Sequence, residues 1–74
     1  HSSIYPNPTK GIFTIRTDAN NIEIEIYSIL GELLLKKQIV GGLRKIDLSR
    51  QSKGIYFVKL KHKGKIEQRK LVLQ

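Results

Sequence analysis

The side chains that could carry out chemistry in this chain are few and widely spaced. The 74 residues include two histidines and no cysteine. A nucleophilic triad needs a histidine base within hydrogen-bond reach of the nucleophile and of an orienting carboxylate. His62 lies among lysines in a predicted hairpin turn, and His1 is the first residue, so neither is placed beside the two aspartates, Asp18 and Asp47. The sequence therefore predicts no catalytic site.

Paired carboxylates are another source of acid–base chemistry, and the chain has one such pair. Glu23 and Glu25 alternate with isoleucines, so on a strand both would project from one face into solvent. Two histidines without cysteine, and two aspartates far apart, match no metal-ligand spacing. The glycines fall where predicted strands end and resemble no phosphate-binding loop. We expect no enzyme, no metal site and no cofactor.

Positive charge dominates the composition. Fourteen basic and six acidic residues give a net charge of +8, which suits an anionic partner such as nucleic acid. Phe57 is the only aromatic residue expected near the basic face, because Tyr56 is predicted to point inward, and single-strand binders usually present exposed aromatics for stacking. We therefore expect no specific nucleic-acid binding, and edge lysines also discourage strand-to-strand aggregation. The basic residues of this face are Lys59, Lys61, Lys63, Lys65, Arg69 and Lys70.

Alternation of apolar and polar residues indicates strands along most of the chain. Residues 22–26 alternate isoleucine with glutamate, as a half-buried strand does. No segment carries a convincing helical stripe, and residues 31–38, the best candidate, are interpreted as strand. Short strands separated by turn signals predict an all-β sandwich or barrel. The expected strands are Ile4–Tyr5, Ile12–Thr17, Ile22–Tyr27, Leu33–Val40, Leu43–Leu48, Ile55–Lys61 and Lys65–Leu73.

A chain of this length forms one domain with a thin core. Residues 1–3 are interpreted as a linker remnant, because the chain opens without methionine or a signal peptide, and residues 4–74 as the domain. No apolar run reaches the ~20 residues that span a bilayer. The predicted inward face comprises Phe13, Ile15, Ile24, Ile26, Leu33, Leu35, Ile46, Leu48, Tyr56, Val58 and Leu60.

The last hairpin permits a prediction of register. A three-residue loop over residues 62–64 places Leu60 opposite Ile66, so that both face the core. Leu71 and Leu73 share a face that could close the core, but their parity is opposite to that of Ile66. The sequence therefore predicts a bulge between Ile66 and Leu71.

Four motifs occur in an order and spacing that resemble a known protein family. They are Tyr5-Pro6-Asn7-Pro8 followed by Gly11, Tyr27 followed by the glycine turn at Gly31, Asp47-Leu48-Ser49 followed by Gly54 and Tyr56, and Lys70-Leu71-Val72-Leu73-Gln74. Together they resemble the type A C-terminal sorting domain of the type IX (Por) secretion system of Bacteroidetes, over nearly the whole chain. One departure is Gln51-Ser52, where the family usually has a leucine, often followed by proline, so an apolar plug is missing from that loop.

The resemblance implies an Ig-like antiparallel β-sandwich of about seven short strands, with no chemistry of its own. It also implies an N-terminal cargo domain in the same precursor, an outer-membrane translocon that recognises the folded domain, and a sortase-like protease that cleaves upstream. The domain would cross the periplasm and then reach the cell surface or the medium, and we expect a monomer. The alternative is a basic β-sandwich module that binds nucleic acid, an anionic surface or carbohydrate.

The terminal strand is the expected contact with the translocon, through its free backbone edge or through its basic flank. Asn7 is expected to bond to local backbone, as are Asp47 and Ser49, and a buried Tyr56 can reach a backbone partner with its hydroxyl. The candidate recognition residues are Arg69, Lys70, Leu71, Val72, Leu73 and Gln74. The motif residues with expected structural roles are Tyr5, Pro6, Asn7, Pro8, Gly11, Tyr27, Gly31, Asp47, Leu48, Ser49, Gly54 and Tyr56.

Overall fold

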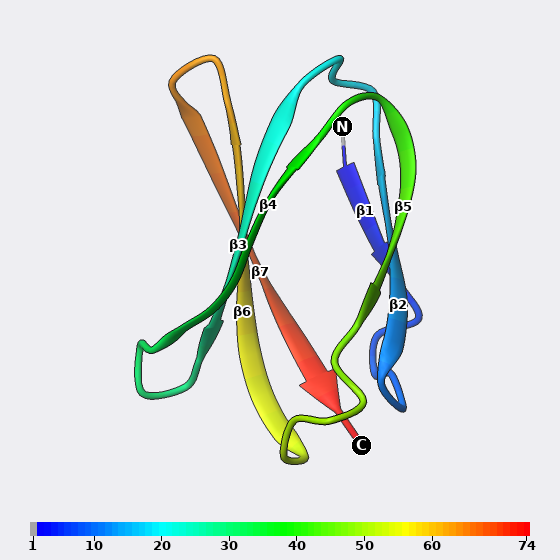
Figure 1. Ribbon diagram of the computed structural model, residues 1–74, viewed down its shortest axis with the longest axis vertical. Helices are drawn as coiled ribbons and strands as arrows, with labels where there is room; N and C mark the ends of the chain where they lie inside the picture. The colour runs from blue at the N-terminus through cyan, green and yellow to red at the C-terminus, as the bar shows by residue number, and fades with distance from the viewer. Residues whose placement is uncertain (1) are drawn as a thin grey trace.

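The observed strands follow the alternation of the sequence. The computed structural model describes residues 2–74 and contains no helix over this range that is long and apolar enough to cross a membrane (Figure 1). Each predicted strand is present, with ends that differ by two residues at most. The strands of residues 2–74 are β1 (Ser2–Tyr5), β2 (Ile12–Thr17), β3 (Ile22–Ser28), β4 (Leu33–Ile39), β5 (Gly42–Asp47), β6 (Gly54–His62) and β7 (Lys65–Leu73).

The first strand begins earlier than predicted. Ser2 and Ser3, which we expected to be linker, pair with Thr17 and Arg16 as part of β1. The Ser2 hydroxyl also donates to the Thr17 hydroxyl at 3.2 Å. His1, the remaining residue of the expected linker, lies outside the described residues.

The strands form two antiparallel sheets, with the orders β1-β2-β5 and β4-β3-β6-β7. The sheets stack as two layers, which Figure 1 shows side by side. The second strand lies beside the fifth and the third beside the sixth, the neighbours that an Ig-like sandwich places together. This arrangement confirms the predicted Ig-like antiparallel β-sandwich.

The core lies between the two layers and consists mainly of aliphatic and aromatic side chains, and Thr9 and Thr17 are also buried. Each residue of the predicted inward face is buried except Leu35, which is partly buried against the core, and Leu33, which is 47% exposed. Ile22, Ile39, Leu71 and Leu73 complete the core. The buried apolar residues are Phe13, Ile15, Ile22, Ile24, Ile26, Ile39, Ile46, Leu48, Tyr56, Val58, Leu60, Leu71 and Leu73.

The prediction for Leu33 is wrong because β4 contains a bulge. The register between β3 and β4 shifts, so that Ile26 pairs with Leu35 but Tyr27 pairs with Leu33. One extra residue, Leu34, stands between them, and an extra residue reverses the side on which preceding residues point. Leu33 therefore lies on the outer face of the sheet, opposite Tyr27.

The predicted register of the last hairpin is also wrong. His62 pairs with Lys65, so the turn has two residues, and Leu60 pairs with Glu67. Both turn residues, Lys63 and Gly64, have positive φ values of 47° and 77°, as a type I′ hairpin turn requires.

The burial argument behind the predicted register failed because Glu67 is not buried. It lies in the edge strand β7, and its carboxylate forms an ion pair with Arg69 at 2.6 Å. The pairing of β6 with β7 then runs without a shift from Gly54 to His62. The predicted bulge is therefore absent from this described pairing, and Ile66 lies outward and 62% exposed.

Candidate recognition site

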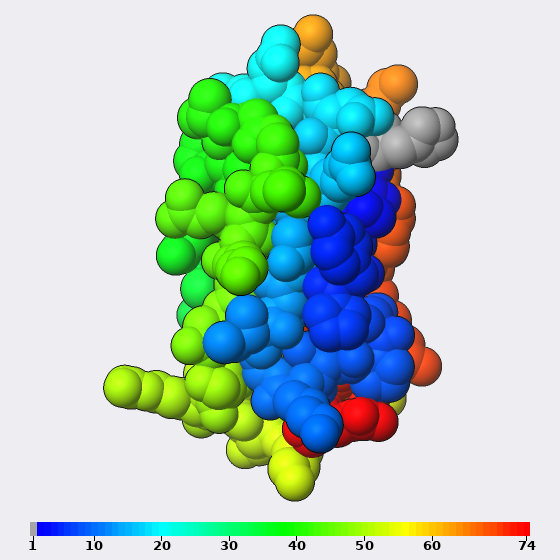
Figure 2. All heavy atoms as spheres, turned by 90° about the vertical axis from the view of Figure 1, so that its right-hand side faces the viewer, coloured from blue at the N-terminus to red at the C-terminus, as the bar shows by residue number. Residues whose placement is uncertain are grey.

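The motifs that are separated in the sequence meet at one end of the sandwich. The segment after β1, the loop after β5 and the end of β7 lie together at the lower end of Figure 1. Figure 2 shows the atoms of the last residues in red, against the blue atoms of the N-terminal segment. A surface hollow of about 520 Å³ marks this junction. Its lining residues are Pro6, Pro8, Thr9, Lys10, Gly11, Ile12, Ser49 and Gln74.

Asn7 joins the N-terminal segment to the terminal strand. Its side-chain nitrogen donates to the backbone oxygen of Lys70 at 2.7 Å, and its side-chain oxygen accepts from the backbone N–H of Val72 at 3.0 Å. These are the two bonds that a neighbouring strand would make, so the carboxamide substitutes for a strand backbone. The expectation that Asn7 bonds to local backbone is therefore wrong.

Thr9 continues the coverage of the same strand edge. Its backbone N–H donates to Val72 oxygen at 2.9 Å, and its backbone oxygen accepts from Gln74 N–H at 2.8 Å. Thr9 thereby forms a parallel bridge with Leu73. Together with the Asn7 bonds, these contacts occupy the outer backbone groups from the Lys70 oxygen to the Gln74 N–H, so the edge that we expected to be free is covered there.

A tight contact holds the loop after β5 against the N-terminal segment. A Cβ at Gly11 would lie 2.8 Å from Ser49 Cβ, and the φ of Gly11 is +146°. Glycine is needed here for both reasons. The Thr9 side chain, 1% exposed, accepts from Gly11 N–H at 3.1 Å and donates to Ile12 oxygen at 2.7 Å. Leu48 N–H donates to Gly11 oxygen at 2.8 Å and closes the contact.

Local bonds shape the loop after β5, as predicted. Ser49 N–H donates to the Asp47 carboxylate at 2.8 Å, and hydrogen bonds from the side chain and backbone of Ser49 hold the pKa of Asp47 below its ordinary value. The hydroxyl of buried Tyr56 donates to the backbone oxygen of Ser52. Gln51 N–H donates to Leu48 oxygen at 2.9 Å. Hydrogen bonds thus hold the loop that contains Gln51-Ser52.

The remaining motif residues have the structural positions of turns and strand ends. Gly31 N–H donates to Ser28 oxygen at 2.9 Å within the β3–β4 turn. Gly54 begins β6 opposite Leu73. Tyr5 ends β1 and is exposed.

The six candidate residues at the end of the chain differ in their exposure and in their contacts. Leu71 and Leu73 are buried in the core, whereas Lys70 and Gln74 are exposed and Val72 is half-buried. Arg69 is engaged within the domain, through its ion pair with Glu67 and a hydrogen bond of 3.4 Å to Ser2 oxygen. The two members of the expected basic flank therefore differ, because the Arg69 side chain, although 41% exposed, is paired within the domain, whereas Lys70 is exposed and forms no ion pair with a described residue.

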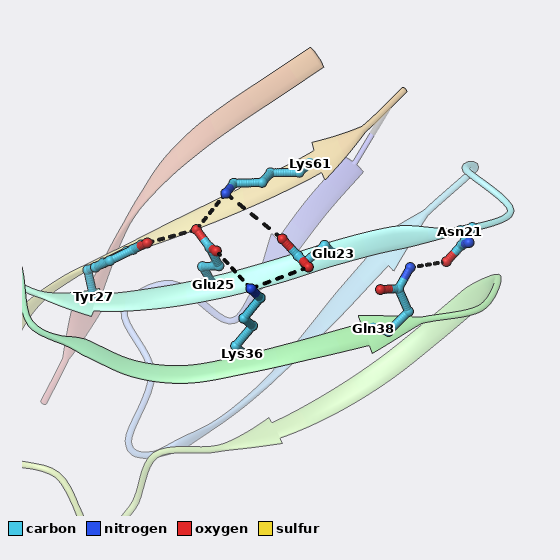
Figure 3. A network of polar contacts seen from close by, with 7 residues as sticks. All are labelled: Asn21, Glu23, Glu25, Tyr27, Lys36, Gln38 and Lys61. Carbon is cyan, nitrogen blue, oxygen red and sulfur yellow. Dashed lines mark hydrogen bonds and ion pairs between the residues drawn. The ribbon is translucent and has the colours of Figure 1, made fainter. Parts of the chain in front are cut away.

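A polar network that sequence reasoning missed lies on the outer face of the four-stranded sheet. Glu25 lies at its centre and is only 5% exposed, and Figure 3 shows the surrounding side chains. The Glu25 carboxylate forms two ion pairs, with the Lys61 ammonium at 3.0 Å and with the Lys36 ammonium at 3.9 Å. Tyr27 donates its hydroxyl to Glu25 at 2.7 Å. Glu23 lies 3.8 Å from Lys36 and 3.9 Å from Lys61.

The pKa values of this network reflect its hydrogen bonds. Bonds from Tyr27 and Lys61 hold the pKa of Glu25 below its ordinary value, against the opposing effect of burial. The same bonds raise the pKa of Tyr27 and of Lys61. The alternation of residues 22–26 predicted that both glutamates share a face, but only the register of β3 with β4 and β6 reveals their partners.

The expectation of a single aromatic on this face is also wrong. Tyr27 pairs directly with Phe57 across β3 and β6, and the Lys59 ammonium lies 4.9 Å from the centre of the Tyr27 ring. Among residues 2–74 there is no group of three or more histidine, cysteine or acidic side chains that could hold a metal ion.

The fold and the junction define an Ig-like sandwich in which a terminal strand is fastened by a Pro-Asn-Pro segment from the opposite end of the chain. A family model for secretion system C-terminal sorting domains matches residues 3–74. The chain belongs to this family, whose members are the C-terminal sorting signals of type IX secretion. A search of curated proteins found no match. The family implies a non-catalytic signal that is attached to a cargo precursor, works with the type IX secretion machinery and leads to export.

Proposed function

We propose that this domain directs its cargo through the outer-membrane translocon by presenting the exposed side chains of the terminal strand. The observation that carries the proposal is the division of residues 69–74. Leu71 and Leu73 fill the core, while Lys70, Val72 and Gln74 reach the surface. The Asn7 and Thr9 contacts occupy the backbone edge at the end of β7. The translocon therefore recognises the side chains of β7 and does not pair with it as an additional strand.

The cargo precedes β1 in the same precursor, which crosses the periplasm before it meets the translocon. A sortase-like protease then cleaves upstream of the domain, and the cargo stays at the cell surface or is released. We propose no catalytic role for the domain in these steps and a monomeric state. The membership in the sorting-domain family supports this sequence of events.

An export assay tests the proposal. A fluorescent protein with a periplasmic signal is fused upstream of this chain in a host that carries the secretion system. The parent fusion should reach the medium or the cell surface, whereas Lys70→Ala should accumulate in the periplasm. Lys45→Ala is the matched control, because Lys45 is an exposed lysine of β5 in the other sheet. Failure to export the parent fusion would contradict the sorting function of this chain.

Arg69→Ala separates recognition from folding. Because Arg69 bonds to Ser2 and Glu67 within the domain, its loss should lower the free energy of unfolding and reduce export only as far as folding is reduced. Equal export of the parent and of a stably folded Lys70→Ala fusion would contradict recognition through the exposed side chains of β7.

A further inference from the structure

The outer face of the four-stranded sheet is divided into an ionic half and an apolar half. The ionic half contains the Glu25 network (Figure 3). In the apolar half, one row of residues crosses four strands: Leu33 pairs with Tyr27, Tyr27 with Phe57, and Phe57 with Lys70. We call this half the apolar patch. It comprises Leu33, Tyr27, Ile55, Phe57 and Val72, with Lys59 and Lys70 among them.

The apolar patch is accessible over its whole width. Leu33 is 47% exposed, and the other apolar members are half-buried. A hollow of about 310 Å³ opens beside Tyr27 and Phe57, and the adjoining turn carries Ile29 and Leu30, the latter 94% exposed. A contiguous exposed apolar surface on a small domain marks a site of interaction.

The charges of the patch have one sign. Neither Lys59 nor Lys70 forms an ion pair with a described residue. On the strands of this outer face the acidic side chains are Glu23 and Glu25, and both are already paired with Lys36 and Lys61. The patch therefore offers an apolar surface with two ammonium groups that lack a carboxylate.

We infer that the apolar patch binds a protein segment of the secretion machinery that presents an apolar side chain flanked by carboxylates. This inference rests on the proposed function. It extends the surface that contacts the translocon from Lys70 and Val72 of β7 across the sheet to Leu33 of β4. The bulge in β4 is what places Leu33 on this face.

Two other occupants fit the patch less well. A second copy of the chain would oppose Lys59 and Lys70 with the same lysines, and like charges in contact weaken an interface. Nucleic acid needs open aromatic faces for stacking. The Tyr27 ring is covered by the Lys59 ammonium, and its hydroxyl is bonded to Glu25.

Variants that change the charge of the patch test the inference in the export assay. Leu33→Glu places a carboxylate in the patch, and we expect exported fluorescence to fall about ten-fold, the loss of one strong interface contact. Lys59→Glu should act in the same direction. Leu33→Lys should be exported better than Leu33→Glu, because a cation faces the carboxylates of the partner. Ile66→Glu is the matched control, since Ile66 is an exposed apolar residue of β7 on the ionic half of the same face.

The outcomes separate this inference from the proposed function. Thermal unfolding of each purified fusion verifies that the domain remains folded. If the parent is exported and Leu33→Glu is exported equally, the patch is not a recognition surface, although the sorting function stands. If the parent is not exported, the sorting function itself fails. Equal losses for Ile66→Glu and Leu33→Glu would also overturn the inference, because the effect would then not be specific to the patch.

Two measurements on the purified parent fusion test the other occupants. Sedimentation should show a monomer, and a dimer that Leu33→Glu dissociates would replace the inferred partner with a second copy. Fluorescence anisotropy with an oligothymidine probe should show no binding that depends on Phe57. Tight binding that Phe57→Ser abolishes would replace the inferred partner with a single-stranded nucleic acid.

Discussion

Asn7 and Val72 are 65 positions apart in the sequence and are joined by a hydrogen bond of 3.0 Å from the Val72 N–H to the Asn7 carboxamide oxygen. The other end of the same carboxamide bonds to Lys70 oxygen. One side chain thus fastens the terminal strand to the segment that follows β1. The first prediction concerns this contact.

Asn7→Ala should loosen the edge of β7 without unfolding the domain. Two exposed hydrogen bonds are lost, which corresponds to about 1–2 kcal/mol of the free energy of unfolding. Asn7→Asp should also be less stable than the parent, because a carboxylate accepts from Val72 but cannot donate to Lys70. Amide hydrogen exchange at Val72 is the direct measurement and should accelerate in both variants. Unchanged protection of the Val72 amide would show that Asn7 does not hold this edge.

Gly11→Ala should destabilise the junction more than Gly31→Ala. Both glycines have positive φ, at +146° and +88°, but only at Gly11 would a Cβ meet another residue, Ser49, at 2.8 Å. We expect a loss of about 1–3 kcal/mol for Gly11→Ala from the clash and the strained backbone together. Urea unfolding compares the two variants. Equal losses would mean that the close approach to Ser49 contributes nothing beyond backbone strain.

The buried end of the terminal strand should be sensitive to truncation of side chains. Leu71 is fully buried, whereas Leu33 is 47% exposed. Leu71→Ala should therefore cost ~2–5 kcal/mol, as core truncations do, while Leu33→Ala should cost much less. Thermal or chemical unfolding of the two variants gives the comparison. Similar losses would indicate that Leu33 packs inward and that β4 has no bulge at Leu34.

Glu25 should make stability depend on acidic pH. Its pKa is lowered in the folded domain by hydrogen bonds from Tyr27 and Lys61. The contribution of the carboxylate is therefore fully present above the unfolded-chain pKa of about 4.3 and is lost as the pH falls through the lower folded-state pKa. Unfolding followed between neutral and acidic pH should show this loss in the parent.

Glu25→Gln provides the test of that assignment. The amide cannot pair with Lys36 and Lys61, so the variant should be less stable than the parent at neutral pH, and the difference should shrink on acidification. Glu32→Gln, in the exposed β3–β4 turn, controls for the removal of one negative charge. A stability difference between Glu25→Gln and the parent that is constant with pH would contradict the role of the carboxylate.

Strand positions and most of the core could be predicted from the sequence because alternation is a local property. Spacing alone is enough to predict which face of a strand carries Phe13 and Ile15, or Val58 and Leu60. Leu33 could not be placed in this way, since a run of three leucines gives no sign of the bulge that reverses its direction. Such a bulge depends on the partner strand.

The register of the last hairpin failed for a related reason. Pairing Leu60 with Ile66 satisfied an assumption that both sides of every inward pair are buried. At the edge of the sandwich that assumption does not hold, because Glu67 remains exposed and pairs with Arg69. The positive φ of Lys63, which makes the two-residue turn possible, also has no signature in a lysine.

The candidate site was predictable as a set of motifs but not as an arrangement. The order of the motifs identified the family, yet the contact between Asn7 and β7 depends on bringing the two ends of the domain together. The difference between Arg69 and Lys70 likewise depends on a tertiary contact, because Arg69 bonds to Ser2 at the other end of the sequence. Tertiary contacts of this kind leave no periodic pattern.

The chain enters and leaves this sandwich at opposite ends. Ser2, at the start of β1, pairs with Thr17 at one end, while Gln74 bonds to Thr9 at the other (Figure 1). The domain measures 31 Å along its longest axis. In the proposed role, a cargo ahead of β1 lies near the middle of the terminal strand, where Arg69 bonds to Ser2, and about one domain length from Gln74 at the end of that strand. Under the proposed function, this distance keeps the junction between Thr9 and the end of β7 away from the cargo, so that one sorting domain suits cargoes of different size.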